Sequence, residues 1–237
     1  MPAPTVSVPD VYALIPPDVF VGVGMILPCE GHFLLGVRPP KLDHSLPVLE
    51  LTAIGGAMET SDASLSAGAL RESQEEIGCT VRFAPCCETL VVHDETHMEW
   101  VRILGPERPA VVVFRHYRTP PHEPWHTQHK GRSCLILFLA DLDGQPAPTD
   151  ELPAAIWLSP EQILLVARQD MPLQQLLDQG ARFLEAQPGS LPRHALARLT
   201  DSQEALVLAL GETAVWFYRE LVRRCAAQEE GASGPGI

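Results

Sequence analysis

The chain has 237 residues, of which 46% are hydrophobic and 20% are charged. This is enough to bury one sizeable core, so we expect one domain with additions. The net charge of −13 excludes a long-range attraction to nucleic-acid phosphate. The six cysteines form no CxxC pair, and no apolar run is long enough to span a bilayer. We therefore expect a soluble cytoplasmic protein that binds neither nucleic acid nor membranes.

The first strands follow an N-terminal arm of residues 1–17, which we expect to be poorly ordered. The run VFVGVGMIL at 19–27 is apolar and rich in β-branched residues, as is typical of a buried strand. The run HFLLGV at 32–37 returns antiparallel to it across a turn. Arg38 follows this second strand directly. Its charge either meets an acidic substrate or is simply exposed to solvent.

A strand at 49–54 leads into a glycine pair, and a short helix is predicted at 70–78. At about 100° per residue, Glu72, Glu75 and Glu76 fall within an arc of about 100° on that helix. Carboxylates held this close repel one another, so a hard divalent cation such as Mg²⁺ or Mn²⁺ explains the cluster. A solvated acidic face of an exposed helix is the alternative explanation.

The stretch from the glycine pair to the end of this helix is GGAMETSDASLSAGALRESQEEIGC, which resembles the signature of the Nudix hydrolases. That signature runs Gly, five residues, Glu, seven residues, Arg-Glu, an aliphatic residue, any residue, Glu-Glu, any residue, Gly. The residues at matching positions are Gly56, Arg71, Glu72, Glu75, Glu76 and Gly78. Asp62 replaces the first glutamate, eight residues rather than seven separate it from Arg71, and Ser73 replaces the aliphatic residue. We expect the Ser73 hydroxyl to donate to a backbone carbonyl one turn earlier.

The resemblance implies an α/β fold, a Nudix-like α/β/α sandwich with a mixed β-sheet. The residue pattern after position 160 adds an expected helical extension at the C-terminus. The resemblance also implies hydrolysis of a diphosphate bond in a nucleoside diphosphate linked to another moiety, with a small-molecule nucleotide as substrate. The implied ligands of Mg²⁺ or Mn²⁺ are the Gly56 carbonyl, Glu72, Glu75 and Glu76. Asp62 and Arg71 are implied to hold the loop against the helix as a bidentate pair, which makes them structural supports.

After the helix, residues 80–92 contain a predicted strand with VRF and ETLVV, followed by the run HDETH at 93–97. Its two histidines are four residues apart, but the run lacks the spacing of a zinc-protease motif. A turn between strands is therefore favoured over a zinc site. Residues 98–104 and 110–118 then predict a second hairpin, joined by the turn sequence GPERP.

The stretch TPPHEPWHTQHK at 119–130 is predicted to be a loop. Trp125 is the candidate for substrate binding there, because its ring can stack on a base, and His122, His126 and His129 can contact phosphate. A plain surface loop is one alternative. A transition-metal site formed by the three histidines is the other.

A buried strand at 134–142 is followed by DELPAAIWLSPE at 150–161. This run is similar to the late Nudix segment in which an acid precedes a Trp-bearing strand and a helix. In some relatives an acid at this place completes the metal shell or serves as the base. The resemblance makes Glu151 the candidate and Asp150 the runner-up, and ordinary loop charges are the alternative. The general base is then Glu151 or one of the three glutamates of the Nudix signature at 56–79 (the box).

Helices are predicted from residue 160 onward, at 160–169, 172–187 and 201–228. The predicted organisation is an N-terminal arm at 1–17, a Nudix-like catalytic domain at 18–160, a helical extension packed on it at 161–228 and a disordered tail at 229–237. The last helix is amphipathic, so its apolar face either packs on the core or forms a homodimer interface.

Three functions are compatible with this fold. A Nudix-fold sensor that binds a nucleotide without cleaving it would be expected to lose glutamates of the box, and all three are present. An isomerase would need a Cys and Glu constellation that is not evident. The box spacing resembles that of the coenzyme A diphosphatases, but their accompanying segment before the glycine pair is not matched. We therefore predict a metal-dependent hydrolase whose particular substrate stays open.

Overall fold

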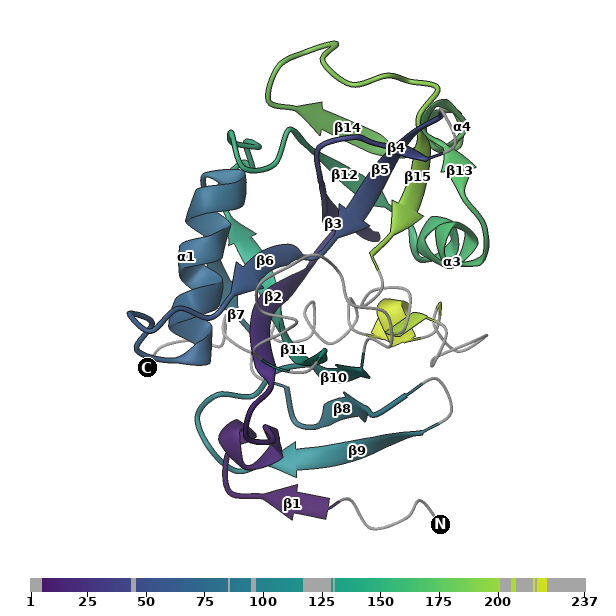
Figure 1. Ribbon diagram of the computed structural model, residues 1–237. Coiled ribbons are helices and arrows are strands. Elements are labelled where there is room, and N and C mark those ends of the chain that lie inside the picture. Colours follow the sequence, from purple (N-terminus) through teal and green to yellow (C-terminus); the bar gives the residue numbers. More distant parts are fainter. Residues whose placement is uncertain are drawn as a thin grey trace, which may run out of the picture.

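The computed structural model describes most of the chain (Figure 1). The described residues are 6–43, 46–84, 86–94, 97–116, 129, 131–200, 206–207, 215 and 217–220. Most of the predicted helix at 201–228 and the tail at 229–237 lie outside them. Within the predicted N-terminal arm, the structure has a strand, β1 (Val6–Val8), and a 3₁₀ helix, η1 (Val11–Leu14). The expectation of poor order is therefore wrong for this part, because β1 pairs with a strand of the main sheet.

Two long strands form the centre of the sheet. β2 (Phe20–Cys29) and β11 (Arg132–Asp143) run parallel to each other. β3 (His32–Val37) returns antiparallel to β2, with Leu34 opposite Leu27. This pairing confirms the predicted first hairpin.

Beyond β11 the sheet continues through β10 (Val111–His116), β8 (Thr89–Val92), β9 (Met98–Ile103) and β1, in that order. β8 pairs parallel with β10 and antiparallel with β9, so it lies between them. The predicted hairpin of 98–104 with 110–118 is therefore wrong, because β9 and β10 each pair with β8 and not with each other. The predicted turn at 93–97 is confirmed: it joins β8 to β9, and the His93 N–H donates to the His97 carbonyl at 2.9 Å.

The other strands extend the sheet on the side of β3 or pair with the two central strands. They are β4 (Lys41–Asp43), β5 (Leu46–Thr52), β6 (Ile54–Ala57), β7 (Thr80–Phe83), β12 (Ala154–Leu158), β13 (Met171–Pro172), β14 (Arg182–Glu185) and β15 (Leu196–Leu199). β3 pairs with both β5 and β12. β6 carries the glycine pair and lies antiparallel to β2, opposite Val23.

The C-terminal part contains strands as well as helices. α3 (Pro160–Arg168) and α4 (Leu173–Asp178) lie where helices were predicted. The predicted helix at 172–187, however, ends at Asp178, and β14 pairs with β12 while β15 pairs with β5. An all-helical extension is therefore wrong, since these two segments satisfy their backbone groups in the sheet.

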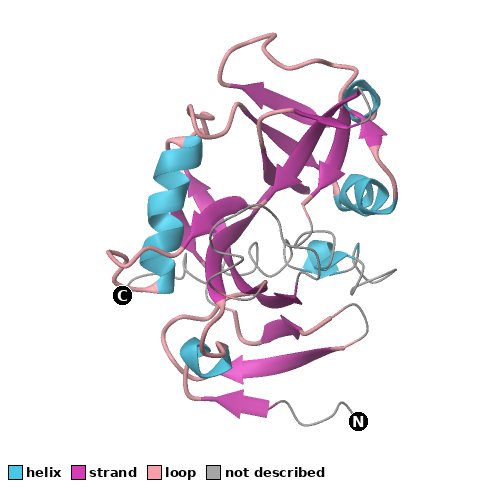
Figure 2. Ribbon diagram, in the orientation of Figure 1, coloured by secondary structure: helices cyan, strands magenta, loops and turns pink. Residues whose placement is uncertain are grey.

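Helices cover both faces of the sheet (Figure 2). Met25 of β2 belongs to the same core cluster as Leu65 of α1 (Leu65–Ile77), whereas its neighbour Ile26 packs in the cluster that contains Ile163 of α3. Successive strand residues point to opposite faces, so α1 and α3 lie on opposite sides. The fold is thus the predicted α/β/α arrangement with a mixed β-sheet. No helix of the described residues is long and apolar enough to cross a membrane.

Candidate active site

Helix α1 presents two of the three box glutamates to the sheet. It begins earlier than predicted, after Ser64, whose side chain accepts the Ala67 N–H at 3.1 Å. Glu72 and Glu76 lie one turn apart and are buried, with 7% and 8% of their surface exposed. The side chain of Glu75 is 40% exposed. The structure therefore brings together two buried carboxylates and a third, that of Glu75, which is partly exposed to solvent beside them.

The glycine pair of β6 lies against both buried glutamates. The Gly55 N–H donates to Glu76 Oε2 at 2.7 Å. Gly55 has a φ of 148°, and a Cβ there would come within 2.2 Å of the Val23 carbonyl oxygen. A Cβ on Gly56 would lie 2.5 Å from Oε1 of Glu72. A larger residue at either position would displace a strand or a carboxylate, so this packing requires glycine.

Arg71 joins the glutamates to the loop before the helix. Its Nη1 donates to Glu72 Oε1 at 2.8 Å and to Glu75 Oε2 at 2.7 Å. Its Nε and Nη2 each donate to an oxygen of Asp62 at 3.1 Å, and Nη2 also donates to the Ala57 carbonyl at 2.9 Å. The Arg71 hydrogen bonds keep the pKa of Asp62 below its usual range. One guanidinium thus connects β6, the loop and α1.

Ser73 occupies the aliphatic position of the box on the buried side of α1. It is fully buried, and its Oγ donates to the Leu70 carbonyl at 2.8 Å, which confirms the predicted hydrogen bond. The hydroxyl therefore has a partner inside the core, and the change from an aliphatic residue leaves the glutamate face undisturbed.

The two buried carboxylates resist ionisation. The pKa of Glu76 is raised to about 8, chiefly because the carboxyl is buried. The charges of Glu72 and Glu151 act in the same direction, whereas the Gly55 N–H and the charge of Arg38 act against them. Burial also raises the pKa of Glu72, against the hydrogen bond from the neighbouring guanidinium. Within the described part of the chain, Glu76 has no ion-pair partner.

This donor set fits a hard divalent ion. The donors that the structure brings together here are carboxylate oxygens, which are ligands that Mg²⁺ and Mn²⁺ prefer. Burial makes the ionised forms of Glu72 and Glu76 unfavourable. A cation bound between the carboxylates would offset this cost. The absence of a side chain on Gly56 keeps the Glu72 carboxylate in place against the strand.

A segment after β11 brings Glu151 toward the same carboxylates. The Thr149 N–H donates to the Glu76 carbonyl at 3.1 Å, and Thr149 Oγ1 donates to the Glu75 carbonyl. Thr149 Oγ1 also accepts the Glu151 N–H at 3.4 Å. These bonds satisfy carbonyls that the end of a helix leaves unpaired. The role of Thr149 was not predicted from the sequence. The only feature that pointed to it was a hydroxyl-bearing residue two positions before the candidate acid Glu151.

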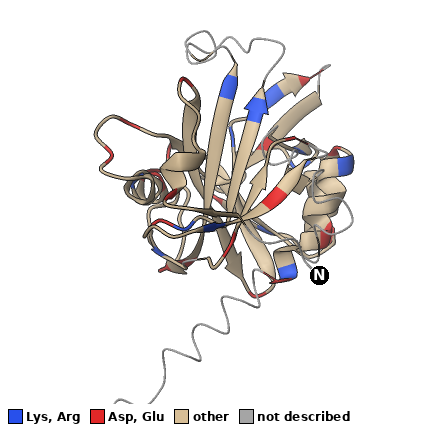
Figure 3. Cartoon of the chain, turned by 90° about the horizontal axis from the view of Figure 1, so that it is seen from below, with Lys and Arg blue, Asp and Glu red and all other residues tan. Residues whose placement is uncertain are grey.

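Arg38 follows β3, where its backbone N–H donates to the Glu50 carbonyl at 2.9 Å. Its side chain is exposed and its charge lowers the pKa of Glu76, so the structure brings it near the cluster. Acidic positions lie on α1 and along the loops beside it (Figure 3). Arg38 therefore supplies a positive charge at a predominantly negative site.

The predicted contact loop at 119–130 lies outside the described residues, except for His129. Trp125, His122 and His126 lie outside the described residues. His129 is described, and its ring meets the edge of Phe20 with centroids 6.2 Å apart. The proposed contact of Trp125 with substrate therefore stays a prediction.

A NUDIX domain profile matches residues 18–179 of the chain. The chain belongs to the Nudix family. Enzymes of this family act on small-molecule nucleotide substrates and use a divalent metal, and the chain is a Nudix pyrophosphohydrolase. The match extends past residue 160 through α3 and α4, so these helices lie within the family domain.

Several solved Nudix structures are similar to this one. A Nudix hydrolase from Nitrosomonas europaea is 18% identical over 68% of this chain and 86% of its own, with a TM-score of 0.39. An Ap4A hydrolase from C. elegans is 14% identical over 64% and 88%, with a TM-score of 0.40. A MutT Nudix hydrolase from Burkholderia pseudomallei is 18% identical over 60% and 84%, with a TM-score of 0.35. No match is found among curated proteins.

Proposed function

We propose that this Nudix enzyme hydrolyses the diphosphate bond of a nucleoside diphosphate linked to another moiety, with Mg²⁺ or Mn²⁺ bound at the box glutamates. The observation that carries the proposal is the pair of buried carboxylates, Glu72 and Glu76, held against Gly55 and Gly56. Buried acids without a cation are costly, so this arrangement is best explained as a metal site.

The proposed metal ligands are the carboxylates of Glu72, Glu75 and Glu76 and the carbonyl of Gly56. When bound, a divalent ion supplies charge neutralisation on the bridging oxygens and lowers the pKa of a coordinated water. Arg71 fixes two of the carboxylates and ties them to Asp62, so it positions the ligands without reacting. This rigid arrangement limits the reorganisation needed during reaction.

Glu151 is the proposed general base. It is exposed and so reaches substrate and water, and Thr149 fixes its backbone beside the end of α1. Its charge acts on both buried glutamates, which supports its closeness to them. A box glutamate is the competing base. If Glu151 is the base, the Glu151→Gln variant loses the pH dependence of its rate; if a box glutamate is the base, the variant keeps it.

Arg38 and Trp125 are the proposed contacts to substrate.

The test is Glu76→Gln, which removes one charge and keeps the shape of the side chain. We expect kcat to fall on the order of 10²–10³-fold with Mg²⁺ while the circular dichroism spectrum stays unchanged. Glu30→Gln is the matched control, because it removes an exposed carboxylate that pairs with Arg182 on the surface. Full activity of Glu76→Gln would refute the metal assignment.

The substrate is found by a panel measured with Mg²⁺ or Mn²⁺. It contains ADP-ribose, dinucleotide polyphosphates, nucleotide sugars, NADH, coenzyme A and nucleoside triphosphates, and cleavage is read as phosphate released by an added phosphatase. Cleavage of a compound that joins a nucleoside diphosphate to another group supports the proposal. Binding of such a compound without cleavage would favour the alternative function, a nucleotide sensor.

A further inference from the structure

The turn between β8 and β9 brings two histidines and a glutamate onto one face of the sheet. In the antiparallel ladder Val91 lies opposite Glu99. Continuing that register places His93 opposite His97, and the backbone bond between them agrees with it. Residues opposite each other, and residues two apart on one strand, point to the same face. His93, His97 and Glu99 therefore project to the same side.

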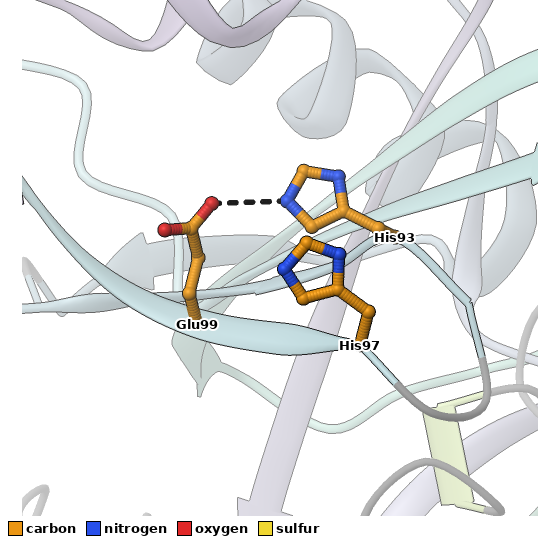
Figure 4. A group of neighbouring side chains, drawn as sticks. All are labelled: His93, His97 and Glu99. Carbon is orange, nitrogen blue, oxygen red and sulfur yellow. Dashed lines mark hydrogen bonds and ion pairs between the residues drawn. The ribbon is translucent and has the colours of Figure 1, made fainter.

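The three side chains converge. His93 Nε2 lies 3.0 Å from Glu99 Oε1, and the rings of His93 and His97 stack with centroids 4.6 Å apart and planes 23° from parallel. Each ring turns a nitrogen toward the side where the Glu99 carboxylate lies (Figure 4). One ligand atom from each residue lies within 4.8 Å of the others. Ligands of one tetrahedral zinc ion lie roughly 3.4 Å apart, so small rotations of these side chains are sufficient.

The surrounding structure holds this group in place. The ring of Phe114, on the neighbouring strand β10, stacks on His93 at 5.4 Å and 19°. Asp94 Oδ1 accepts the His97 N–H at 2.9 Å and fixes the turn. The side chains of His93 and Glu99 remain 36% and 43% exposed, so an ion can enter from solvent. The site is therefore both supported and accessible.

We propose that His93, His97 and Glu99 bind a transition-metal ion of the Zn²⁺ type. Two imidazoles and one carboxylate select Zn²⁺ and similar ions over Mg²⁺, whereas the glutamates of α1 are an all-oxygen set that suits Mg²⁺. Two stacked imidazoles repel each other if both are protonated, and a shared metal takes the place of those protons. The turn lies well away from α1 (Figure 1), so the two sites are separate.

A metal at this place fastens the end of β8 to the start of β9. β8 pairs with β10, and β9 pairs with β1. The bound ion would therefore join the two strands that connect the edge of the sheet to its centre. Because the ion binds only when the hairpin is formed, it should stabilise the folded chain. Three protein ligands leave room for a water molecule in the fourth position.

The test is calorimetric titration of the full-length protein with Zn²⁺, after chelation and desalting and in the presence of millimolar Mg²⁺ to occupy the glutamates of α1. We expect one equivalent of Zn²⁺ to bind. His97→Gln and Glu99→Gln, which change exposed side chains, should each weaken this binding about 100-fold or more. His194→Gln, at an exposed histidine outside the group, and Glu76→Gln should leave it unchanged.

Two further measurements complete the test. Zn²⁺ should raise the melting temperature of the wild type and of His194→Gln, but not that of His97→Gln. Co²⁺ should give visible absorption bands that are lost in the same variant. Circular dichroism confirms that each variant is folded. The absence of zinc binding in the wild type, or its retention in both His97→Gln and Glu99→Gln, would overturn the proposal.

Discussion

Burial and neighbouring charges both act on the Glu76 carboxyl. Its pKa is raised from 4.5 to about 8 in the folded chain without metal. Below pH 4.5 the carboxyl is protonated in both the folded and unfolded states, so its burial then costs little. Between these values the unfolded state loses the proton and the folded state keeps it, so stability falls as the pH rises through this window.

We therefore expect Glu76→Gln to stabilise the metal-free protein at pH 8, by about 5 °C or more in melting temperature. Glutamine is neutral at every pH and can still accept the Gly55 N–H. The difference from wild type should disappear near pH 4.5. Thermal unfolding in the presence of a chelator at several pH values measures this. An equal melting temperature of the two proteins at pH 8 would show that Glu76 is not a costly acid.

Residue positions inside the box could be predicted because they depend on local spacing. Helical geometry and the signature together indicated Glu72, Glu75 and Glu76. The hydrogen bond of the Ser73 hydroxyl was predictable because its acceptor lies one turn earlier on the same helix. The sequence did not show that Glu75 is partly exposed. That follows from the packing of α1 on β6, which involves residues far apart in the chain.

At the scale of elements, the end of α1 and the segment before β12 act together. Thr149 bonds to the carbonyls of Glu75 and Glu76 through its hydroxyl and its N–H, and it accepts the N–H of Glu151. These contacts make Thr149 a positioning residue for the proposed base. Misplacement of a catalytic group by about 1 Å is enough to slow a reaction strongly.

Thr149→Val keeps the shape of this side chain and removes its hydroxyl. We expect kcat to fall on the order of tenfold, with KM and Mg²⁺ affinity unchanged, because the metal ligands stay in place. Thr149→Ser restores the hydroxyl and should restore kcat. In a Glu151→Gln background the Thr149→Val change should add nothing, which steady-state kinetics of the double variant can check. Additive losses would mean that Thr149 does not act through Glu151.

The elements that the sequence did not reveal depend on distant partners. The first hairpin was predictable because its strands are neighbours in the chain and share a turn. Residues 182–185 are a strand only because β12 lies beside them, and residues 98–103 pair with β8 rather than with β10. That His93 and His97 lie opposite each other could be recognised only once the pairing of β8 with β9 was known.

At the scale of the whole molecule, the C-terminal segment contacts two distant parts of the sheet. The Tyr218 ring meets the edge of Phe33 on β3 with centroids 4.8 Å apart. Phe217 lies 6.2 Å from Trp100 on β9. Both residues are buried, as is Leu206. The described part of this segment thus packs as a core face, one of the two predicted roles of the last helix, and the homodimer stays a prediction.

Replacing Tyr218 with alanine should therefore destabilise the whole fold. Loss of a buried aromatic ring costs about 3–5 kcal/mol, which corresponds to roughly 6–20 °C in melting temperature for a chain of this length. Tyr218→Phe is the matched control, since it keeps the ring and its packing against Phe33. Thermal unfolding followed by circular dichroism measures both variants. Because the ring lies on the face opposite α1, kcat of folded Tyr218→Ala should stay close to that of wild type at low temperature. If the alanine variant melts at the wild-type temperature, the C-terminal segment does not stabilise the Nudix core.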